Sequence, residues 1–170
     1  MRRSDASGGR GRRGASAPRL ADANINPATG LATDYLNHFN EAIMLLEMLS
    51  ACPECLDDFL GWRPMSYREH FVASRFKGRD LAIAAYDAAD PSLRNCLDTL
   101  AGTMTAVLEA TRAAMSADMP PDAAAALADR AAAWLKLLVA RAGAVINGEP
   151  DAALTQPVTP QAVVDGLMKR

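Results

Sequence analysis

The chain has 170 residues, enough for one domain and a tail, and half of them are hydrophobic, so it can bury a substantial core. Aromatic residues make up only 5% of the sequence and alanine supplies much of the apolar content, a balance that favours helices over strands. The net charge of −2 combines +4 in residues 1–22 with −6 in the remainder, and such an acidic body argues against a nucleic-acid-binding fold.

Residues 1–30 are rich in glycine, serine, alanine and arginine and contain almost nothing to bury, so we expect a disordered basic tail. A single helical domain should then occupy residues 31–170. The tail can attract nucleic acid only weakly, and it lacks the apolar segment of a secretory signal. Because no run of about 18 apolar residues follows it, the sequence predicts no transmembrane segment and a cytoplasmic protein. The arginines of this segment are Arg2, Arg3, Arg10, Arg12, Arg13 and Arg19.

The first long helix should begin near Thr33, a favourable N-cap, and end at Cys52-Pro53. Its core face is predicted from apolar residues at helical spacing. Met44 and Met48 add apolar surface beside that face, which is typical of a helix that is either central or covered by another chain. A homodimer is therefore one hypothesis. The core-face residues are Leu36, Phe39, Ile43, Leu46 and Leu49.

A short helix over 53–60, stopped by Gly61, should follow. Ser66 and Glu69 then match the S-x-x-E capping box that marks a helix start. Apolar and small residues keep one face from there to about residue 89. The pattern predicts one helix over this range, or two collinear pieces separated at Gly78.

Three further helix starts are marked by proline. Asp90-Pro91 places an Asp cap before a proline at the first helical position, and this helix should reach Met115. Pro120-Pro121 should open the next helix, which Asn147-Gly148 closes, and Thr159-Pro160 should open a short terminal helix. The sequence therefore predicts an all-α fold, an antiparallel bundle of about four main helices with additional short ones.

Recognition should be concentrated in the first half of the domain, because seven of the nine aromatic residues fall between positions 35 and 76. On a continuous helix Arg68, Arg75 and Arg79 would share a face. Aromatic and arginine side chains dominate binding hot spots. We therefore hypothesise a non-enzymatic interaction module, an adaptor or regulator, whose partner is another protein of acidic character. The residues expected to bind are Trp62, Arg63, Tyr67, Arg68, His70, Arg75 and Arg79.

The alternative hypothesis is a metal- or thiol-dependent protein that uses Cys52 and Cys55. A C-x-x-C pair can ligate zinc or act as a redox dithiol. A separate candidate metal site consists of His38 and Glu41, which share a helix face with Asp34. A second C-x-x-C is absent from the sequence, and three cysteines, an odd number, argue against a closed disulfide framework. The leading hypothesis therefore includes no metal and no cofactor.

A third group of hypotheses comprises a small-ligand bundle, a phosphotransfer module and an enzyme with dispersed site residues. Either His38 or His70 is a candidate phosphate acceptor, and His70 has Lys77 two helical turns later. Catalytic motifs such as G-x-S-x-G and H-E-x-x-H are absent from the sequence, so no catalytic residue is predicted.

Overall fold

The computed structural model describes residues 16–115, 119–149, 161, 165 and 166, and within them it confirms an all-α fold. These residues form no strand, only an isolated bridge between Ile25 and Ala32. No helix in this part of the chain is long and apolar enough to cross a membrane. The elements are α1 (Ala17–Asp22), the 3-10 helix η1 (Thr33–Tyr35), α2 (Leu36–Met48), α3 (Cys55–Gly61), α4 (Tyr67–Ala73), α5 (Arg79–Ala88), α6 (Pro91–Ala114) and α7 (Pro121–Ile146).

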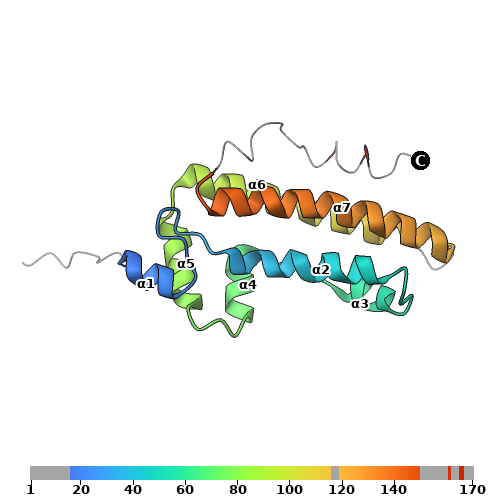
Figure 1. Ribbon diagram of the computed structural model, residues 1–170, viewed down its shortest axis with the longest axis horizontal. Helices are drawn as coiled ribbons and strands as arrows, with labels where there is room; N and C mark the ends of the chain where they lie inside the picture. The colour runs from blue at the N-terminus through green and yellow to red at the C-terminus, as the bar shows by residue number, and fades with distance from the viewer. Residues whose placement is uncertain (1–15, 116–118, 150–160, 162–164, 167–170) are drawn as a thin grey trace, which may run out of the picture.

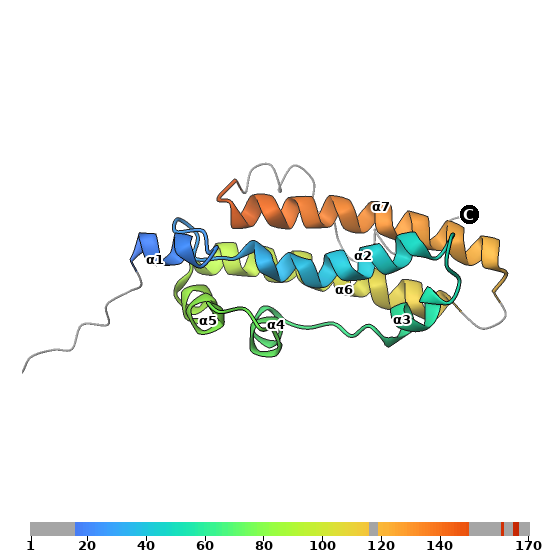
Figure 2. The same cartoon turned by 60° about the horizontal axis from the view of Figure 1, so that its bottom comes forward.

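Three helices, α2, α6 and α7, run along the long axis of the molecule (Figure 1). Helix α7 runs antiparallel to the other two and packs against both of them. The short helices α3, α4 and α5 lie on the side opposite α7, and Figure 2 shows α4 and α5 almost end-on. The architecture is therefore a bundle of three long helices covered on one side by shorter helices.

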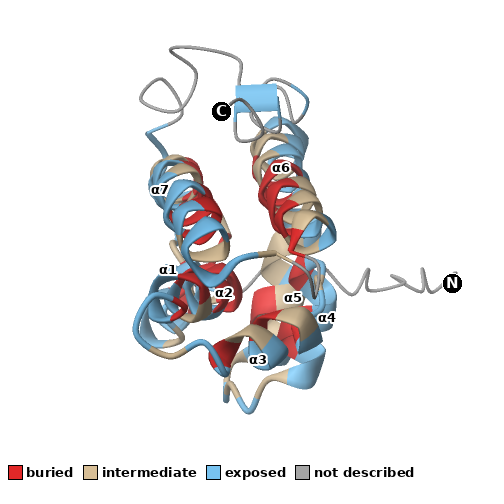
Figure 3. Cartoon of the chain, turned by 90° about the vertical axis from the view of Figure 1, so that its right-hand side faces the viewer, coloured by how far each residue is buried: buried red, intermediate tan, exposed pale blue. Residues whose placement is uncertain are grey.

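The core lies between these helices, and Figure 3 shows the buried residues of α6 and α7 on the sides that face each other. The core is lined by alanines of α7, by leucines of α6 and α7, and by phenylalanines of α2, α3 and α4. The largest fully buried side chains include Phe39, Phe59, Phe71, Leu46, Leu97, Met104, Leu108, Leu135 and Leu138.

Both proline-marked starts of the long helices are confirmed. The Asp90 carboxylate accepts hydrogen bonds from the main-chain N–H groups of Ser92 and Leu93, and Pro91 is the first residue of α6. These bonds, together with one from the Ser92 hydroxyl, lower the pKa of Asp90. Helix α7 begins at Pro121, and it ends before Gly148, whose φ of +82° is a left-handed conformation that glycine adopts without strain.

The first long helix is present, but its ends differ from the prediction. Thr33 does not cap it; Thr33 is the first residue of η1, and no side chain caps that element. Helix α2 ends at Met48, before Cys52-Pro53 is reached, and in the turn that follows the N–H groups of Ala51 and Cys52 both donate to the Met48 carbonyl, at 3.0 and 2.8 Å. The short helix that ends at Gly61 is confirmed as α3.

The prediction of one helix, or two collinear pieces, over residues 66–89 is wrong. The capping box is present: the Glu69 N–H donates to Ser66 Oγ, and the Ser66 N–H donates to the Glu69 carboxylate. However, α4 ends at Ala73, and α5 returns beside it as the second arm of a hairpin (Figures 1 and 2). Ser74 has an extended backbone, and this reverses the chain direction.

The prediction of a disordered segment up to residue 30 is wrong for residues 16–30. This segment forms α1 and a loop whose side chains Leu20, Ile25 and Thr29 are buried. Leu20 and Ile25 are the only large apolar side chains among these three, and they suffice to hold the segment in place because the loop also packs against α5 and the end of α7. Residues 1–15 and most of the predicted helix after Thr159-Pro160 lie outside the described residues.

Candidate functional site

The predicted recognition region contains a buried cluster of aromatic and histidine side chains. The His38 ring of α2 stacks on Trp62 with 4.5 Å between ring centroids. Trp62 Nε1 donates to the His38 carbonyl oxygen at 3.3 Å, and the Met65 N–H donates to His38 Nε2 at 3.1 Å. These contacts fix the connector between α3 and α4 against α2. Burial, and secondarily the nearby His70, lower the pKa of His38 from 6.5 to about 4.

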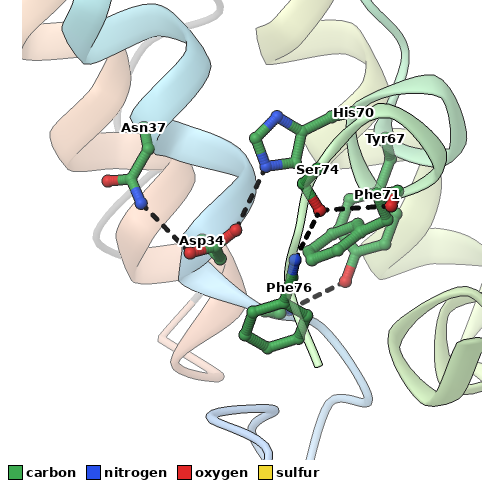
Figure 4. Close-up of polar contacts among 8 residues, drawn as sticks. Asp34, Asn37, Tyr67, His70, Phe71, Ser74 and Phe76 are labelled. Carbon is green, nitrogen blue, oxygen red and sulfur yellow. Dashed lines mark hydrogen bonds and ion pairs between the residues drawn. The ribbon is translucent and has the colours of Figure 1, made fainter. Parts of the chain in front are cut away.

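His70 of α4 faces the carboxylate of Asp34 in η1, as Figure 4 shows. His70 Nε2 lies 3.2 Å from Asp34 Oδ2, while Asn37 donates to the other carboxylate oxygen at 3.2 Å. The side chain of His70 is only 11% exposed, and that of Asp34 is 30% exposed. A phosphate acceptor needs an accessible imidazole, so the burial of both His38 and His70 argues against a phosphotransfer module.

Two tyrosines of the same region also have their hydroxyls directed at the main chain. The Tyr67 hydroxyl accepts a hydrogen bond from the Ala32 N–H at 3.0 Å. The Tyr35 hydroxyl donates to the Met65 carbonyl, also at 3.0 Å. Burial is the main reason that the pKa values of both tyrosines lie above their usual range. These hydroxyls therefore join η1 to α4 and to the connector before it.

A groove of about 450 Å³ lies between the connector before α4, the end of α5 and the face of α6. Several of its polar lining groups already have partners. Tyr86 donates to the Asp98 carboxylate at 2.7 Å, and both residues line the groove. Arg68, which also lines it, forms an ion pair with Asp87 outside the groove, across the open end of the α4–α5 hairpin. Burial, and then the bond to Asp98, raise the pKa of Tyr86 to about 12.

The turn that closes the α4–α5 hairpin, residues 75–79, carries Arg75, Lys77 and Arg79, all exposed; we call it the basic turn. Ser74 holds its start: the Ser74 hydroxyl donates to the Phe71 carbonyl at 3.1 Å and accepts from the Phe76 N–H at 3.3 Å (Figure 4). The Phe76 ring packs against Phe71, with 5.4 Å between centroids. An inward phenylalanine therefore anchors a turn whose charged side chains face solvent.

The cations of the basic turn have few partners. Arg79 lies 3.7 Å from the highly exposed carboxylate of Asp80. Neither Arg75 nor Lys77 forms a hydrogen bond or ion pair with any other residue that the structure describes. The turn with Asp80 therefore has a net charge of +2 on a molecule whose overall charge is negative.

The cysteine pair lies at the corner between α2 and α3, with the Cys55 thiol donating to Cys52 Sγ at 2.9 Å. In the described chain no group of three histidine, cysteine or acidic residues is placed to hold a metal ion. His38 and Glu41 therefore do not join the two thiols in a ligand set. Instead, His38 bonds the connector before α4, and Glu41 is exposed on α2.

The predicted binding residues separate into two groups. Trp62, Tyr67 and His70 are buried in the cluster and are not available as surface anchors in this conformation. The arginines are exposed, but they do not share a helix face, because the chain reverses between α4 and α5. Arg63 donates to the carbonyls of Leu60 and Trp62, Arg68 pairs with Asp87, and Arg75 and Arg79 lie in the basic turn.

Sequence reasoning missed two lining residues of the groove, Tyr86 and Asp98. They are 12 positions apart and belong to different helices, so no local spacing connects them. Helical spacing places Lys77 two turns after His70, whereas in the structure it lies between Arg75 and Arg79 on one turn. The signal for that turn was the pair of residues Ser74 and Gly78, a helix competitor and a helix breaker close together.

No protein-family model, no curated protein and no solved structure matches the chain, so these comparisons do not assign it to a family.

Proposed function

We propose that the chain is a non-enzymatic protein-interaction module that binds an acidic segment of another protein at the basic turn. The observation that carries this proposal is the state of Arg75 and Lys77: both are exposed, and neither has a partner within the described chain. A cation that stabilises the fold would be expected to pair with one of the many carboxylates of this acidic chain. Such unpaired cations are available for the carboxylates of another molecule.

The turn is suited to this role because its backbone is held in place. The Ser74 hydroxyl bonds to the main chain on both sides of the chain reversal, and Phe76 packs on Phe71. The turn therefore loses little conformational entropy when a partner binds. Arginine guanidinium groups can bind carboxylates through two parallel hydrogen bonds, which gives directional recognition. Helix α1 extends the surface: a Cβ on Gly78 would lie 3.0 Å from Ala23, just after α1, and α1 carries the exposed Arg19.

The buried cluster supports this surface without contacting the partner. The Asp34–His70 contact fixes α4 to η1, and Tyr67 bonds the Ala32 N–H. The hairpin, and the basic turn at its end, are therefore attached to η1 and to the residue before it by polar bonds. In this proposal the aromatic residues determine the position of the cations.

The test is a pulldown from the native cell with three baits: the wild type, Arg75→Gln/Lys77→Gln, and Arg130→Gln/Lys136→Gln. The two double variants lose the same charge, but the control pair lies on α7, away from the basic turn, and includes Lys136, which forms an ion pair with Glu47 of α2. We expect a partner that the wild type and the control retain, and that the Arg75/Lys77 variant loses. Retention should also fall as salt is raised, because exposed charges are screened.

The proposal fails if the same proteins are retained by all three baits, or lost equally from both double variants. It also fails if retention is insensitive to salt. The retained partner, once purified, should have its affinity for the Arg75→Gln/Lys77→Gln variant reduced by about tenfold or more, since each lost charge-assisted bond contributes about 1.5 kcal/mol or more. Circular dichroism of each variant checks that its fold is intact.

A further inference from the structure

Cys52 and Cys55 are brought together by a turn that the main chain itself closes. The Cys55 N–H donates to the Cys52 carbonyl at 3.0 Å, and Pro53 occupies the position of the turn where its fixed φ is favoured. The ends of such a turn have Cα atoms less than about 7 Å apart. Disulfides need Cα atoms about 4.4 to 6.8 Å apart. The backbone therefore already has the spacing that a disulfide requires.

The side chains agree with the backbone. The two sulfur atoms are 2.9 Å apart, and closing the remaining distance to a bond of about 2.0 Å requires only side-chain rotation. Cys52 is partly exposed, whereas Cys55 is buried at the start of α3. One thiol can therefore be reached by a reagent in solution, and the second lies directly behind it.

The hydrogen bond between the thiols gives them different roles. Cys55 donates to Cys52 Sγ, and this bond, with burial as the second cause, raises the pKa of Cys55 to about 11. Cys55 thus keeps its proton more strongly than an ordinary thiol does. Cys52 is the partly exposed thiol of the pair, so it is the one that a reagent in solution reaches first.

We propose that Cys52 and Cys55 are a thiol–disulfide exchange site that is oxidised reversibly by small disulfides of the glutathione class. The Cys52 thiolate attacks one sulfur of the small disulfide, the sulfur–sulfur bond breaks, and one thiolate leaves and takes up a proton. Cys55 then loses its proton to solvent, and its sulfur attacks Cys52 Sγ in the mixed disulfide. The second small thiol leaves, so that the protein dithiol loses two electrons and the small disulfide gains them.

This site is independent of the proposed binding function. It lies at the α2–α3 corner, whereas the basic turn joins α4 to α5 (Figure 1). A disulfide across two intervening residues closes a very short loop, for which the entropic stabilisation of the fold is least. We therefore expect the protein to fold whether Cys52 and Cys55 are thiols or form a disulfide.

The experiment uses the full chain in buffers of oxidised and reduced glutathione, followed by alkylation, intact mass and peptide mapping. The internal control is Cys96 on α6, which is partly buried and whose pKa burial raises. We expect the Cys52–Cys55 disulfide to form roughly tenfold faster than a glutathione adduct at Cys96. Reduced glutathione should restore the two thiols. The Cys55→Ser variant should stop at a glutathione adduct on Cys52, and Cys96→Ser should behave as the wild type.

Two outcomes would overturn the proposal. In one, Cys52 and Cys55 are alkylated as completely as Cys96 after oxidation. In the other, the wild type accumulates a glutathione adduct on Cys52 that does not go on to the Cys52–Cys55 disulfide, which would show that Cys55 does not resolve the mixed disulfide. Because oxidation of the wild type and of Cys96→Ser is read without any change at the α2–α3 corner, a folding defect in the Cys55→Ser variant would leave both outcomes measurable.

Discussion

The Thr29 hydroxyl donates a hydrogen bond of 2.6 Å to the carbonyl oxygen of Ile146, a residue 117 positions later in the chain. Ile146 is the last residue of α7, so the bond satisfies one of the carbonyls that a helix leaves without an internal partner at its C-terminus. Thr29 also accepts the Leu31 N–H at 3.3 Å. One buried hydroxyl thus joins the loop after α1 to the longest helix of the bundle.

We expect Thr29→Val to lower the free energy of unfolding by about 2 kcal/mol, because an isosteric side chain removes both bonds and leaves buried main-chain groups unpaired. Urea unfolding measures the change. The matched control is Thr99→Val, whose exposed hydroxyl bonds only within α6, to the Asn95 carbonyl. That control should change stability by less than about 0.5 kcal/mol. Equal effects of the two substitutions would show that the loop does not support α7.

Gly30 provides a second measure of the same loop. Its φ is +73°, and a Cβ there would lie 2.9 Å from the main-chain oxygen of Ala85 in α5. We therefore expect Gly30→Ala to destabilise the fold by about 2 to 3 kcal/mol, through backbone strain and the close contact together. Gly102 of α6 differs from Gly30 because it is exposed and has room for a methyl group: no atom of a neighbouring residue lies within 4 Å of its Cβ position.

Replacing Gly102 should stabilise the protein by about 0.5 to 1 kcal/mol, because alanine loses less backbone entropy than glycine in a helix interior. Thermal unfolding followed by circular dichroism measures both glycine substitutions. If Gly30→Ala were as well tolerated as Gly102→Ala, the loop would not be packed against α5.

The features that could be predicted from the sequence are those whose atoms lie close together in the chain. The capping box of Ser66 and Glu69 and the Asp90 cap each join residues at most three positions apart, so local chemistry determines them. The ordered loop around Ile25 could not be predicted in this way, because its stability depends on distant partners such as Ile146. A sparse apolar pattern looks the same whether or not another part of the chain covers it.

The sequence predicted neither the hairpin turn nor the burial of the aromatic side chains, and the two predictions failed for different reasons. Helical apolar spacing continues past Ser74, but the Ser74 hydroxyl bonds to its own main chain and competes with the helix. Trp62 and Tyr67 combine an apolar body with a polar tip, which suits a core as well as an interface. Only the structure shows that their polar groups bond to main-chain atoms, the His38 carbonyl and the Ala32 N–H.

The buried His38 predicts how stability depends on pH. Its folded pKa of about 4 lies below the ordinary value of 6.5, so between these two values the unfolded chain binds a proton that the folded chain does not. The contribution of the neutral ring is therefore complete above pH 6.5 and is lost as pH falls towards 4. Between pH 7 and pH 5 the wild type should lose about 2 kcal/mol more stability than His38→Gln.

Glutamine is a suitable replacement because its side-chain carbonyl can still accept the Met65 N–H that His38 Nε2 accepts. Urea unfolding of both proteins at several pH values measures the difference, and proton NMR of the imidazole reports the folded pKa directly. A ring that titrates near 6.5, or equal losses in the two proteins, would contradict the prediction. Either result would mean that the stack of His38 on Trp62 opens readily to water, since burial is the main cause of the lowered pKa.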